Sequence, residues 1–159
     1  MNSALMFSRA SDEWSTPLAT FNALNAEFGF NHDAAATDEN SWVDGDYFGL
    51  DHRRPEQRDA LAVENWKPYG PVIWLNPPYS KCREFMAKAA AEAKKGCTVV
   101  CLVPARTDTR WFHEHVWDRE TNQPRPGVEV RFLKGRLKFG GSPAGAPFPS
   151  VVIVFRGSR

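Results

Sequence analysis

The chain has 159 residues, a length typical of one domain and too short for a catalytic core with a separate recognition domain. With 42% hydrophobic, 25% charged and 13% aromatic residues, its composition fits a packed core and argues against wholesale disorder. The net charge is only +1, but residues 1–66 carry 12 acidic and 4 basic side chains, whereas residues 67–159 carry 7 acidic and 16 basic ones. The second part of the chain is therefore predicted to face an anion.

Other features exclude whole classes of protein. The first residues lack a basic region followed by an apolar run, and no stretch approaches the roughly 18 apolar residues of a membrane span. We therefore expect a cytoplasmic protein that does not bind a membrane. Cys82, Cys97 and Cys101 form no spaced framework and are predicted to be reduced core residues. A nucleophile elbow and a phosphate loop are both missing, so hydrolase and kinase functions have no support.

The first predicted elements are a helix and a short strand. Apolar residues recur at helical spacing over 18–28, which predicts a helix there. Thr16 is the expected N-cap, Pro17 the first helical residue and Gly29 the end. Residues 30–33 are typical of a strand.

The middle of the chain predicts a βαβ unit. Residues 37–70 are polar and rich in Asp, Gly and Trp, so we expect mostly loop, with a weak helical pattern over 56–63. Two apolar strands follow, at 71–75 and 97–103, on either side of an Ala-rich helix over 80–95.

The last third predicts a helix over 108–117 and strands over 128–133 and 151–155, with a Gly- and Pro-rich span at 140–149. Strands and helices therefore alternate along the chain. This alternation predicts an α/β fold whose sheet is covered by helices on both faces.

The turn Asn76-Pro77-Pro78-Tyr79 follows the strand at 71–75, where α/β folds bind ligands. Its prolines fix the backbone, so the Asn76 side chain and the Pro77 carbonyl project as two acceptors from a rigid turn. Tyr79 adds an aromatic plane. An exocyclic amine on a planar base has two N–H donors and a π face, so the turn predicts a base-amine pocket. A plain strand-terminating turn is the alternative.

A basic stretch near the carboxyl end is the densest in the chain. Within 125–159, seven basic residues face one acid, Glu129. The seven are Arg125, Arg131, Lys134, Arg136, Lys138, Arg156 and Arg159. Such a surface is expected to contact phosphates, with a solvated basic face and no polyanion partner as the alternative.

Short segments in a fixed order carry a family resemblance. They are Trp14-Ser15-Thr16-Pro17, Phe28-Gly29-Phe30, Asp33-Ala34-Ala35, Asp59-Ala60-Leu61 before Trp66, Trp74-Leu75-Asn76-Pro77-Pro78-Tyr79, Val103-Pro104 with Thr107, Asp108, Thr109 and Trp111, Arg136-Leu137-Lys138-Phe139, and Pro149-Ser150. In these segments the chain resembles the phage-type DNA N6-adenine methyltransferases, which are Rossmann-like and use S-adenosylmethionine. The resemblance spans nearly the whole chain, and Asn-Pro-Pro-Tyr is its most specific element.

This resemblance implies one Rossmann-like methyltransferase domain over residues 1–159, with a mixed, mostly parallel sheet and helices on both faces. Residues 1–12 are a candidate for disorder, and residues 37–70 are expected to be a loop-rich insertion. The resemblance also implies a phage or prophage protein that acts in the cytoplasm of a bacterial host.

The resemblance assigns catalysis to the Asn-Pro-Pro-Tyr turn. Asn76 and the Pro77 carbonyl would accept hydrogen bonds from the adenine N6 amine, and Pro78 would keep the turn rigid. Tyr79 would stack on an adenine flipped out of the duplex, because the amine is inaccessible inside the stack. Cys82, although close in sequence, is expected to pack rather than to act as a nucleophile.

The S-adenosylmethionine site is implied by the resemblance at seven positions. Asp33 would lie near the methionine moiety and Asp59 near the adenosine. The full set is Trp14, Thr16, Pro17, Asp33, Ala34, Asp59 and Asn76. The glycine-rich loop found in many relatives is absent, since Asp33-Ala34-Ala35-Ala36 stands in its place.

DNA is the expected partner, with double-stranded DNA favoured and single-stranded DNA left open. The residues expected to bind it are Lys81, Arg106, Arg110, Arg136 and Lys138. Because no recognition domain is expected, loops 37–54 and 119–127 would read the bases, and the target site should be short or relaxed.

Two other functions remain open. The same chemistry suits cytosine N4, RNA adenine or a protein glutamine amide, since each offers an amine on a planar carrier. A nucleic-acid-binding module without catalysis is the second, because the glycine loop is missing. No metal is expected: His113 and His115 are two apart and so point to different faces of a helix.

Overall fold

The computed structural model describes residues 16–138 and 145–158. Our expectations for residues 1–12, for Trp14 and for Arg159 lie outside these residues, as does part of the span 140–149.

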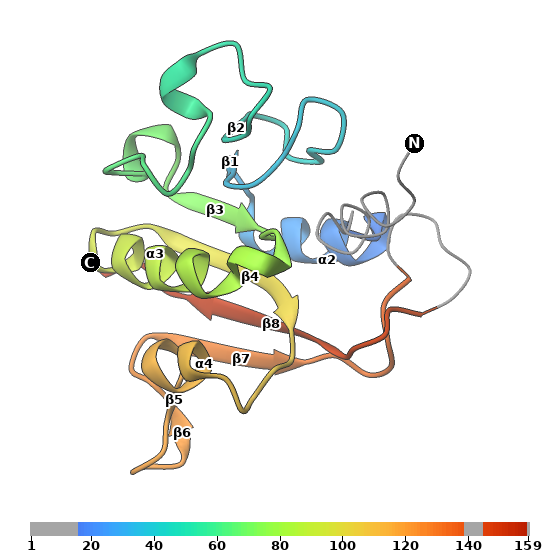
Figure 1. Cartoon of the computed structure of the whole chain (residues 1–159), viewed down its shortest axis with the longest axis vertical. Helices are drawn as coiled ribbons and strands as arrows, with labels where there is room; N and C mark the ends of the chain where they lie inside the picture. Colours follow the sequence, from blue (N-terminus) through green and yellow to red (C-terminus); the bar gives the residue numbers. More distant parts are fainter. Residues whose placement is uncertain (1–15, 139–144, 159) are drawn as a thin grey trace.

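A six-stranded mixed sheet forms the centre of the molecule, in the order β2-β1-β3-β4-β8-β7 (Figure 1). The strands are β1 (His32–Asp33), β2 (Asp46–Tyr47), β3 (Val72–Leu75), β4 (Thr98–Pro104), β7 (Val128–Phe132) and β8 (Ser150–Phe155). The first four in this order are parallel, whereas β8 is antiparallel to both of its neighbours. The predicted α/β class, with a mixed and mostly parallel sheet, is confirmed.

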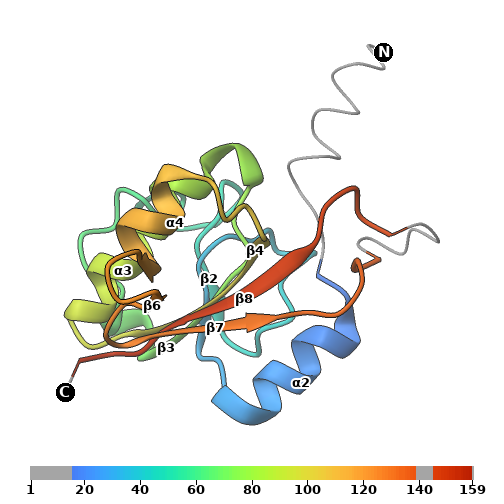
Figure 2. The same ribbon diagram turned by 90° about the horizontal axis from the view of Figure 1, so that it is seen from below.

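Helices cover both faces of this sheet, as the sequence predicted (Figure 2). Helix α2 (Leu18–Phe28) lies on one face, and α3 (Cys82–Lys94) and α4 (Arg110–His115) lie on the other. Side chains of β3 and β4 alternate between the two sides, as strand geometry requires. One set packs with α2 and the other with α3 and α4, which gives two buried clusters separated by the sheet.

The start of α2 corrects the prediction for Thr16 and Pro17. The helix begins at Leu18, and Pro17 is the N-cap residue, without a side-chain capping bond. The Thr16 hydroxyl instead accepts a hydrogen bond from Asn76, sixty residues away, so a tertiary contact takes the group that capping would use. The predicted end is confirmed, since Gly29 has a left-handed φ of 66° and donates its N–H to the Asn25 carbonyl.

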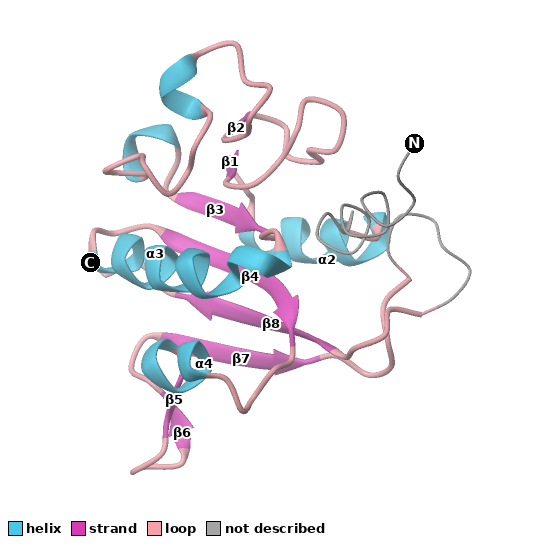
Figure 3. Cartoon of the chain, in the orientation of Figure 1, coloured by secondary structure: helices cyan, strands magenta, loops and turns pink. Residues whose placement is uncertain are grey.

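The segments that lack periodicity differ most from the prediction (Figure 3). The weak helical pattern at 56–63 forms one short 3₁₀ helix, Pro55–Gln57, followed by turns over 59–63, and no α-helix. Another turn forms at Lys67–Tyr69, and strand β2 was not predicted. The helix predicted over 108–117 is wrong at both ends, because α4 has six residues.

A hairpin replaces the end of that predicted helix. It pairs β5 (Trp117–Asp118) with β6 (Gln123–Pro124). Asn122, in the turn of this hairpin, has a φ of 55°. Asparagine tolerates this left-handed conformation, but a right-handed helix does not contain it. Trp117 satisfies the apolar pattern in a different way, by stacking on Phe112 with ring centroids 6.3 Å apart.

A buried carboxylate on α3 fastens the segment 37–70 to that helix. Glu92 is fully buried, accepts the backbone N–H of Trp66 at 2.6 Å and pairs with Lys95 at 2.9 Å. Removing the carboxylate leaves a buried N–H without its acceptor. We expect Glu92→Ala to lower the free energy of unfolding by about 2–4 kcal/mol, measured in urea.

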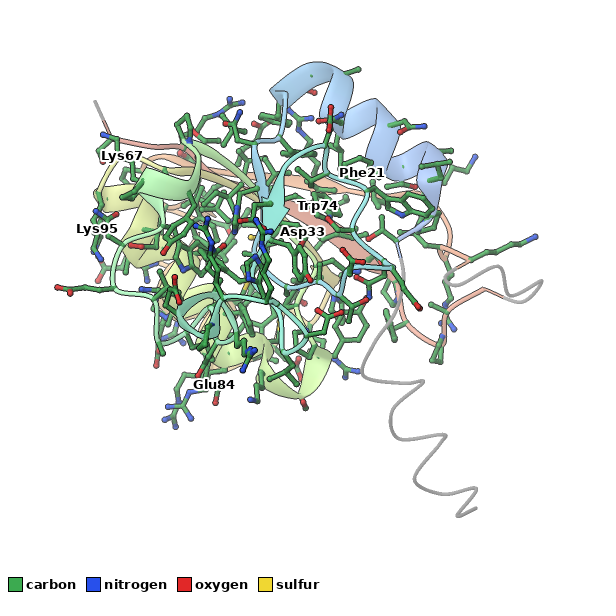
Figure 4. The ribbon with its side chains drawn as sticks, turned by 90° about the horizontal axis from the view of Figure 1, so that it is seen from above. Phe21, Asp33, Lys67, Trp74, Glu84 and Lys95 are labelled. Carbon is green, nitrogen blue, oxygen red and sulfur yellow. The ribbon has the colours of Figure 1, made fainter. Side chains whose placement is uncertain are left out.

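Glu84 provides the matched control on the same helix. It is exposed and points away from the body of the protein (Figure 4), so Glu84→Ala should change stability by less than about 0.5 kcal/mol. Equal losses in the two variants would show that helix propensity, and not the Trp66 contact, sets the effect.

Candidate functional site

The strand connections create a crevice between β1 and β3. From β1 the chain moves outward to β2, and it then returns across the sheet to β3 and on to β4. Neighbouring strands whose connections leave in opposite directions open a crevice at their carboxyl ends, where α/β folds bind ligands. Asp33 ends β1 beside Trp74, and Asn76 follows the end of β3 (Figure 4).

A cavity of about 370 Å³ lies at this crevice. Its walls come from the ends of β1 and β3, from the segment 37–61 and from the first turns after β3. They are formed by Thr16, Asp33, Ala34, Ala35, Ala36, Thr37, Asn40, Trp42, Phe48, Gly49, Leu50, Arg58, Asp59, Ala60, Leu61, Trp74, Asn76, Pro78, Lys81 and Phe85. Five of the seven positions predicted for the cofactor are among them, whereas Pro17 is not and Trp14 lies outside the described residues.

Asp33 is the buried acid of this cavity. Its side chain is only 4% exposed; one carboxylate oxygen accepts the Ala35 N–H at 3.1 Å and the other accepts the Ser41 hydroxyl at 3.2 Å. Burial raises the pKa of Asp33 to about 7, against the lowering effect of these two hydrogen bonds. The cavity therefore holds a carboxyl group whose ionisation a bound cation would favour.

Asn76 and Pro78 line the cavity from the end of the neighbouring strand, β3. The Asn76 amide donates through Nδ2 to the Thr16 hydroxyl at 2.9 Å. Pro77 is buried, and the Pro78 carbonyl accepts the Lys81 N–H at 2.9 Å, which closes a 3₁₀ turn at Tyr79–Lys81. The predicted rigid turn at the end of a strand is present.

Tyr79 lies beside this cavity and does not line it. Its ring meets the edge of Phe148 with centroids 5.1 Å apart and an interplanar angle of 80°. The hydroxyl is buried with no hydrogen-bond partner in the described part of the chain, and burial raises the pKa of Tyr79. The turn therefore separates two environments, the cavity on the Asn76 side and an aromatic pair on the Tyr79 side.

Phe48 and Gly49, in the segment 37–70, supply part of a cavity wall that the sequence did not indicate. The Phe48 N–H donates to the Asp33 carbonyl at 2.8 Å, and the Phe48 carbonyl accepts the Ala36 N–H at 3.0 Å. A Cβ at Gly49 would collide with the Ala36 carbonyl. The missing side chain of Gly49 thus lets its backbone approach the Ala34–Ala36 turn closely. Gly49 lies far along the sequence from residues 33–36, where relatives have a glycine-rich loop.

Trp42 and Trp111 lie in different surroundings. Trp42 is at the cavity rim, 47% exposed, with its indole N–H donating to the Thr16 carbonyl at 3.3 Å. Trp111 lies on α4 and packs in the buried core on the face of the sheet that α3 and α4 cover. Cys82 is also buried, and burial raises the pKa of its thiol to about 12, so the thiolate needed for a nucleophile is disfavoured.

The basic stretch at 125–159 is less available to an anion than its composition predicted. Arg131 makes a bidentate pair with Glu27 at 2.7 and 2.6 Å and also bonds Glu129. Arg156 bonds Glu129 at 2.8 Å, and Arg125 donates to the His113 carbonyl. Arg131 is thereby tied to α2 through Glu27, Arg156 to β7 through Glu129, and Arg125 to α4 through the His113 carbonyl.

The five residues predicted to bind DNA are all exposed. Lys81 reaches the cavity rim, and Arg106 follows the end of β4. Arg136 and Lys138 follow β7, which runs parallel to β3, so they leave the sheet at the same edge as Asn76. Arg110 begins α4 and lines a second hollow of about 490 Å³ with Arg119 and Arg125.

The two loops expected to read bases lie in different places. Several residues of the loop 37–54 line the cavity. The loop 119–127 belongs to the β5–β6 hairpin, which projects at the lower edge of Figure 1, whereas β1 and β2 lie at the top.

The described residues hold neither a metal-binding cluster nor a membrane-spanning helix. No group of three or more His, Cys, Asp or Glu side chains in residues 16–138 and 145–158 is arranged to hold a metal ion. Within the same ranges, no helix has the length and apolar character required to cross a membrane.

Comparison with known proteins gives a consistent family. A sequence model described as DNA N-6-adenine-methyltransferase (Dam) matches residues 4–150. Two proteins named DNA N-6-adenine-methyltransferase, from Escherichia phage T1 and Haemophilus phage HP1 (strain HP1c1), are each 31% identical over 104 residues. These alignments cover 65% and 64% of this chain but 40% and 54% of the phage proteins, so the chain matches about half the length of these relatives. Because the family match covers most of the chain, including both sides of the cavity, the protein belongs to the DNA N-6-adenine-methyltransferase (Dam) family.

Proposed function

We propose that this chain is a single Rossmann-like methyltransferase domain that transfers a methyl group from S-adenosylmethionine to the N6 amine of adenine in double-stranded DNA. One observation carries the proposal. The cavity at the carboxyl ends of β1 and β3 is lined both by a buried acid, Asp33, and by Asn76 of the amine-binding turn, although the two are 43 positions apart in sequence.

The cavity fits S-adenosylmethionine in size and in chemistry. Its volume of about 370 Å³ lies within the ~300–1,000 Å³ usual for cofactor pockets. Phe48, Leu61 and Trp42 supply apolar walls for an adenosine moiety, and Asp33 supplies a carboxylate for the ammonium of the methionine moiety. When bound, S-adenosylmethionine provides an electrophilic methyl group on a sulfonium. Small residues at Ala34–Ala36 and Gly49 take the place of a glycine loop.

The chain's own residues would position the acceptor amine. The Asn76 carbonyl oxygen and the Pro77 carbonyl accept its two N–H groups, which directs the nitrogen electron pair away from the base plane and toward the cavity. The base would be flipped out and held at the Tyr79 side of the turn, which costs a few kcal/mol of unstacking. Catalysis is then mainly positioning, worth up to about 7–11 kcal/mol of the barrier.

Arg106, Arg136 and Lys138 would contact DNA phosphates around the cavity. Replacing all three by alanine should lower the slope of log affinity against log salt by about 0.9 per lost contact and weaken DNA binding at least tenfold at low salt. Fluorescence anisotropy of a labelled duplex measures both. Lys94→Ala, an exposed charge in the last turn of α3, is the control and should bind like the wild type.

The test of the proposed reaction is transfer of radiolabelled methyl from S-adenosylmethionine to unmethylated DNA, followed by nucleoside analysis. Label in N6-methyladenine supports the proposal. Label in N4-methylcytosine, or in RNA or protein instead of DNA, would keep the chemistry and replace the substrate. Absence of label on every polymer, together with retained DNA binding, would favour a binding module without catalysis.

A further inference from the structure

Thr16 joins three segments at the cavity. Its hydroxyl accepts a hydrogen bond from Asn76 Nδ2 at 2.9 Å, and its carbonyl accepts one from Trp42 Nε1 at 3.3 Å. It directly precedes Pro17, the N-cap of α2, whose carbonyl accepts the Phe21 N–H at 3.1 Å. Thr16 is 7% exposed, so its side chain sits in one defined place between a helix start, the cavity rim and the Asn-Pro-Pro-Tyr turn.

The Asn76 amide has two nearly isosteric ends with opposite hydrogen-bonding character. To bind the N–H of an incoming amine, the Asn76 side chain must turn its carbonyl oxygen Oδ1 toward that amine. Nδ2 cannot take this place, because it is itself a hydrogen-bond donor. In that orientation Nδ2 points to Thr16, where the hydroxyl oxygen accepts. A hydroxyl can also donate, but the orientation that serves an incoming amine is the one in which Thr16 accepts.

We infer that Thr16 is a positioning residue that holds the Asn76 amide with its carbonyl oxygen toward the acceptor amine. This inference rests on the proposed function. Thr16 acts through Asn76 and need not touch the base. Its own position is fixed from two sides, by the start of α2 and by Trp42, so the segment 37–50 that walls the cavity is tied to the amine-binding turn through one residue.

The test is Thr16→Val, which keeps the shape and removes the acceptor. We expect kcat to fall about 10- to 100-fold, since small errors in the position of a reacting group have costs of this size. The KM for S-adenosylmethionine should stay within a few fold. Thr16→Ser, which restores the hydroxyl, should recover most of the kcat. Thr20→Val, on α2 and outside the cavity lining, is the matched control.

Three outcomes would overturn the inference. A raised KM for S-adenosylmethionine with unchanged kcat would make Thr16 a cofactor contact only. Equal loss in Thr16→Val and Thr16→Ser would indicate packing, and wild-type kinetics in Thr16→Val would remove the role altogether. Failure of the wild type to methylate in the same assay would instead count against the proposed function.

A second measurement does not depend on activity. Thermal unfolding of Thr16→Val, Asn76→Ala and the double variant should give non-additive shifts in Tm, because each single change breaks the same hydrogen bond. Additive shifts would mean that the two side chains do not interact in solution, and the inference would fail.

Discussion

Asn76→Ala is expected to abolish detectable methyl transfer, a loss of about a thousandfold or more, while affinity for S-adenosylmethionine stays within a few fold. The side chain contributes an acceptor for the amine, whereas the cavity has nineteen other lining residues, Asp33 among them. Single-turnover transfer measures the first quantity, and calorimetric titration with S-adenosylmethionine measures the second.

Two further variants sharpen this result. Asn76→Asp keeps an acceptor toward the amine and can accept from the Thr16 hydroxyl, so it should retain measurable transfer. Asn22→Ala, an exposed position on α2, should behave as the wild type. Lost cofactor binding in Asn76→Ala would mean that Asn76 is chiefly a cofactor contact and that its role in the reaction is misassigned.

The parts of the fold that could be predicted from sequence are those that satisfy a local pattern. The spacing of Phe21 and Leu24 with Gly29 beyond them predicts α2, and the apolar runs around the double proline predict β3 and β4. These signals are local because the helix buries one face against the sheet and each of these strands is itself buried within the sheet. The cavity edge is predictable for the same reason, since Asn76 follows such a strand.

The rest depends on contacts between distant segments. The hydroxyl of Thr16 suits a helix cap by its place in the sequence, but Asn76 reaches it through the fold. Arg131 belongs to a basic stretch by composition, yet Glu27 from α2 pairs with it. Phe48 and Gly49 lie in a polar segment without periodicity, so nothing local marks them as a cavity wall.

Asp33→Asn is expected to separate cofactor binding from stability. Asparagine can keep the hydrogen bond from Ala35 and remain close to Ser41, but it has no charge for the S-adenosylmethionine ammonium. Affinity for S-adenosylmethionine should fall on the order of a hundredfold, as for other buried charge pairs that lose one partner. Asp44→Asn, an exposed carboxylate in the same segment of chain, should leave affinity unchanged.

Asp33→Asn should be more stable than the wild type although it binds the cofactor less tightly, and the size of the gain in stability depends on pH. The pKa of Asp33 is about 7 in the folded protein and near the ordinary aspartate value of 3.8 when unfolded, so between these values only the folded state holds the proton. The free energy of unfolding therefore falls as pH rises from about 4 to 7, and at pH 8 the wild type carries a buried charge. Asp33→Asn removes that charge and should raise the Tm by several degrees at pH 8 and by much less at pH 5.

Affinity of the wild type for S-adenosylmethionine should rise with pH through about 7, because a cation prefers the ionised carboxylate, and this dependence should vanish in Asp33→Asn. Normal binding of S-adenosylmethionine by Asp33→Asn at pH 8 would show that the buried acid does not face the ammonium. A Tm of Asp33→Asn that fails to rise at pH 8 would show that the acid is ionised at little cost in the folded protein.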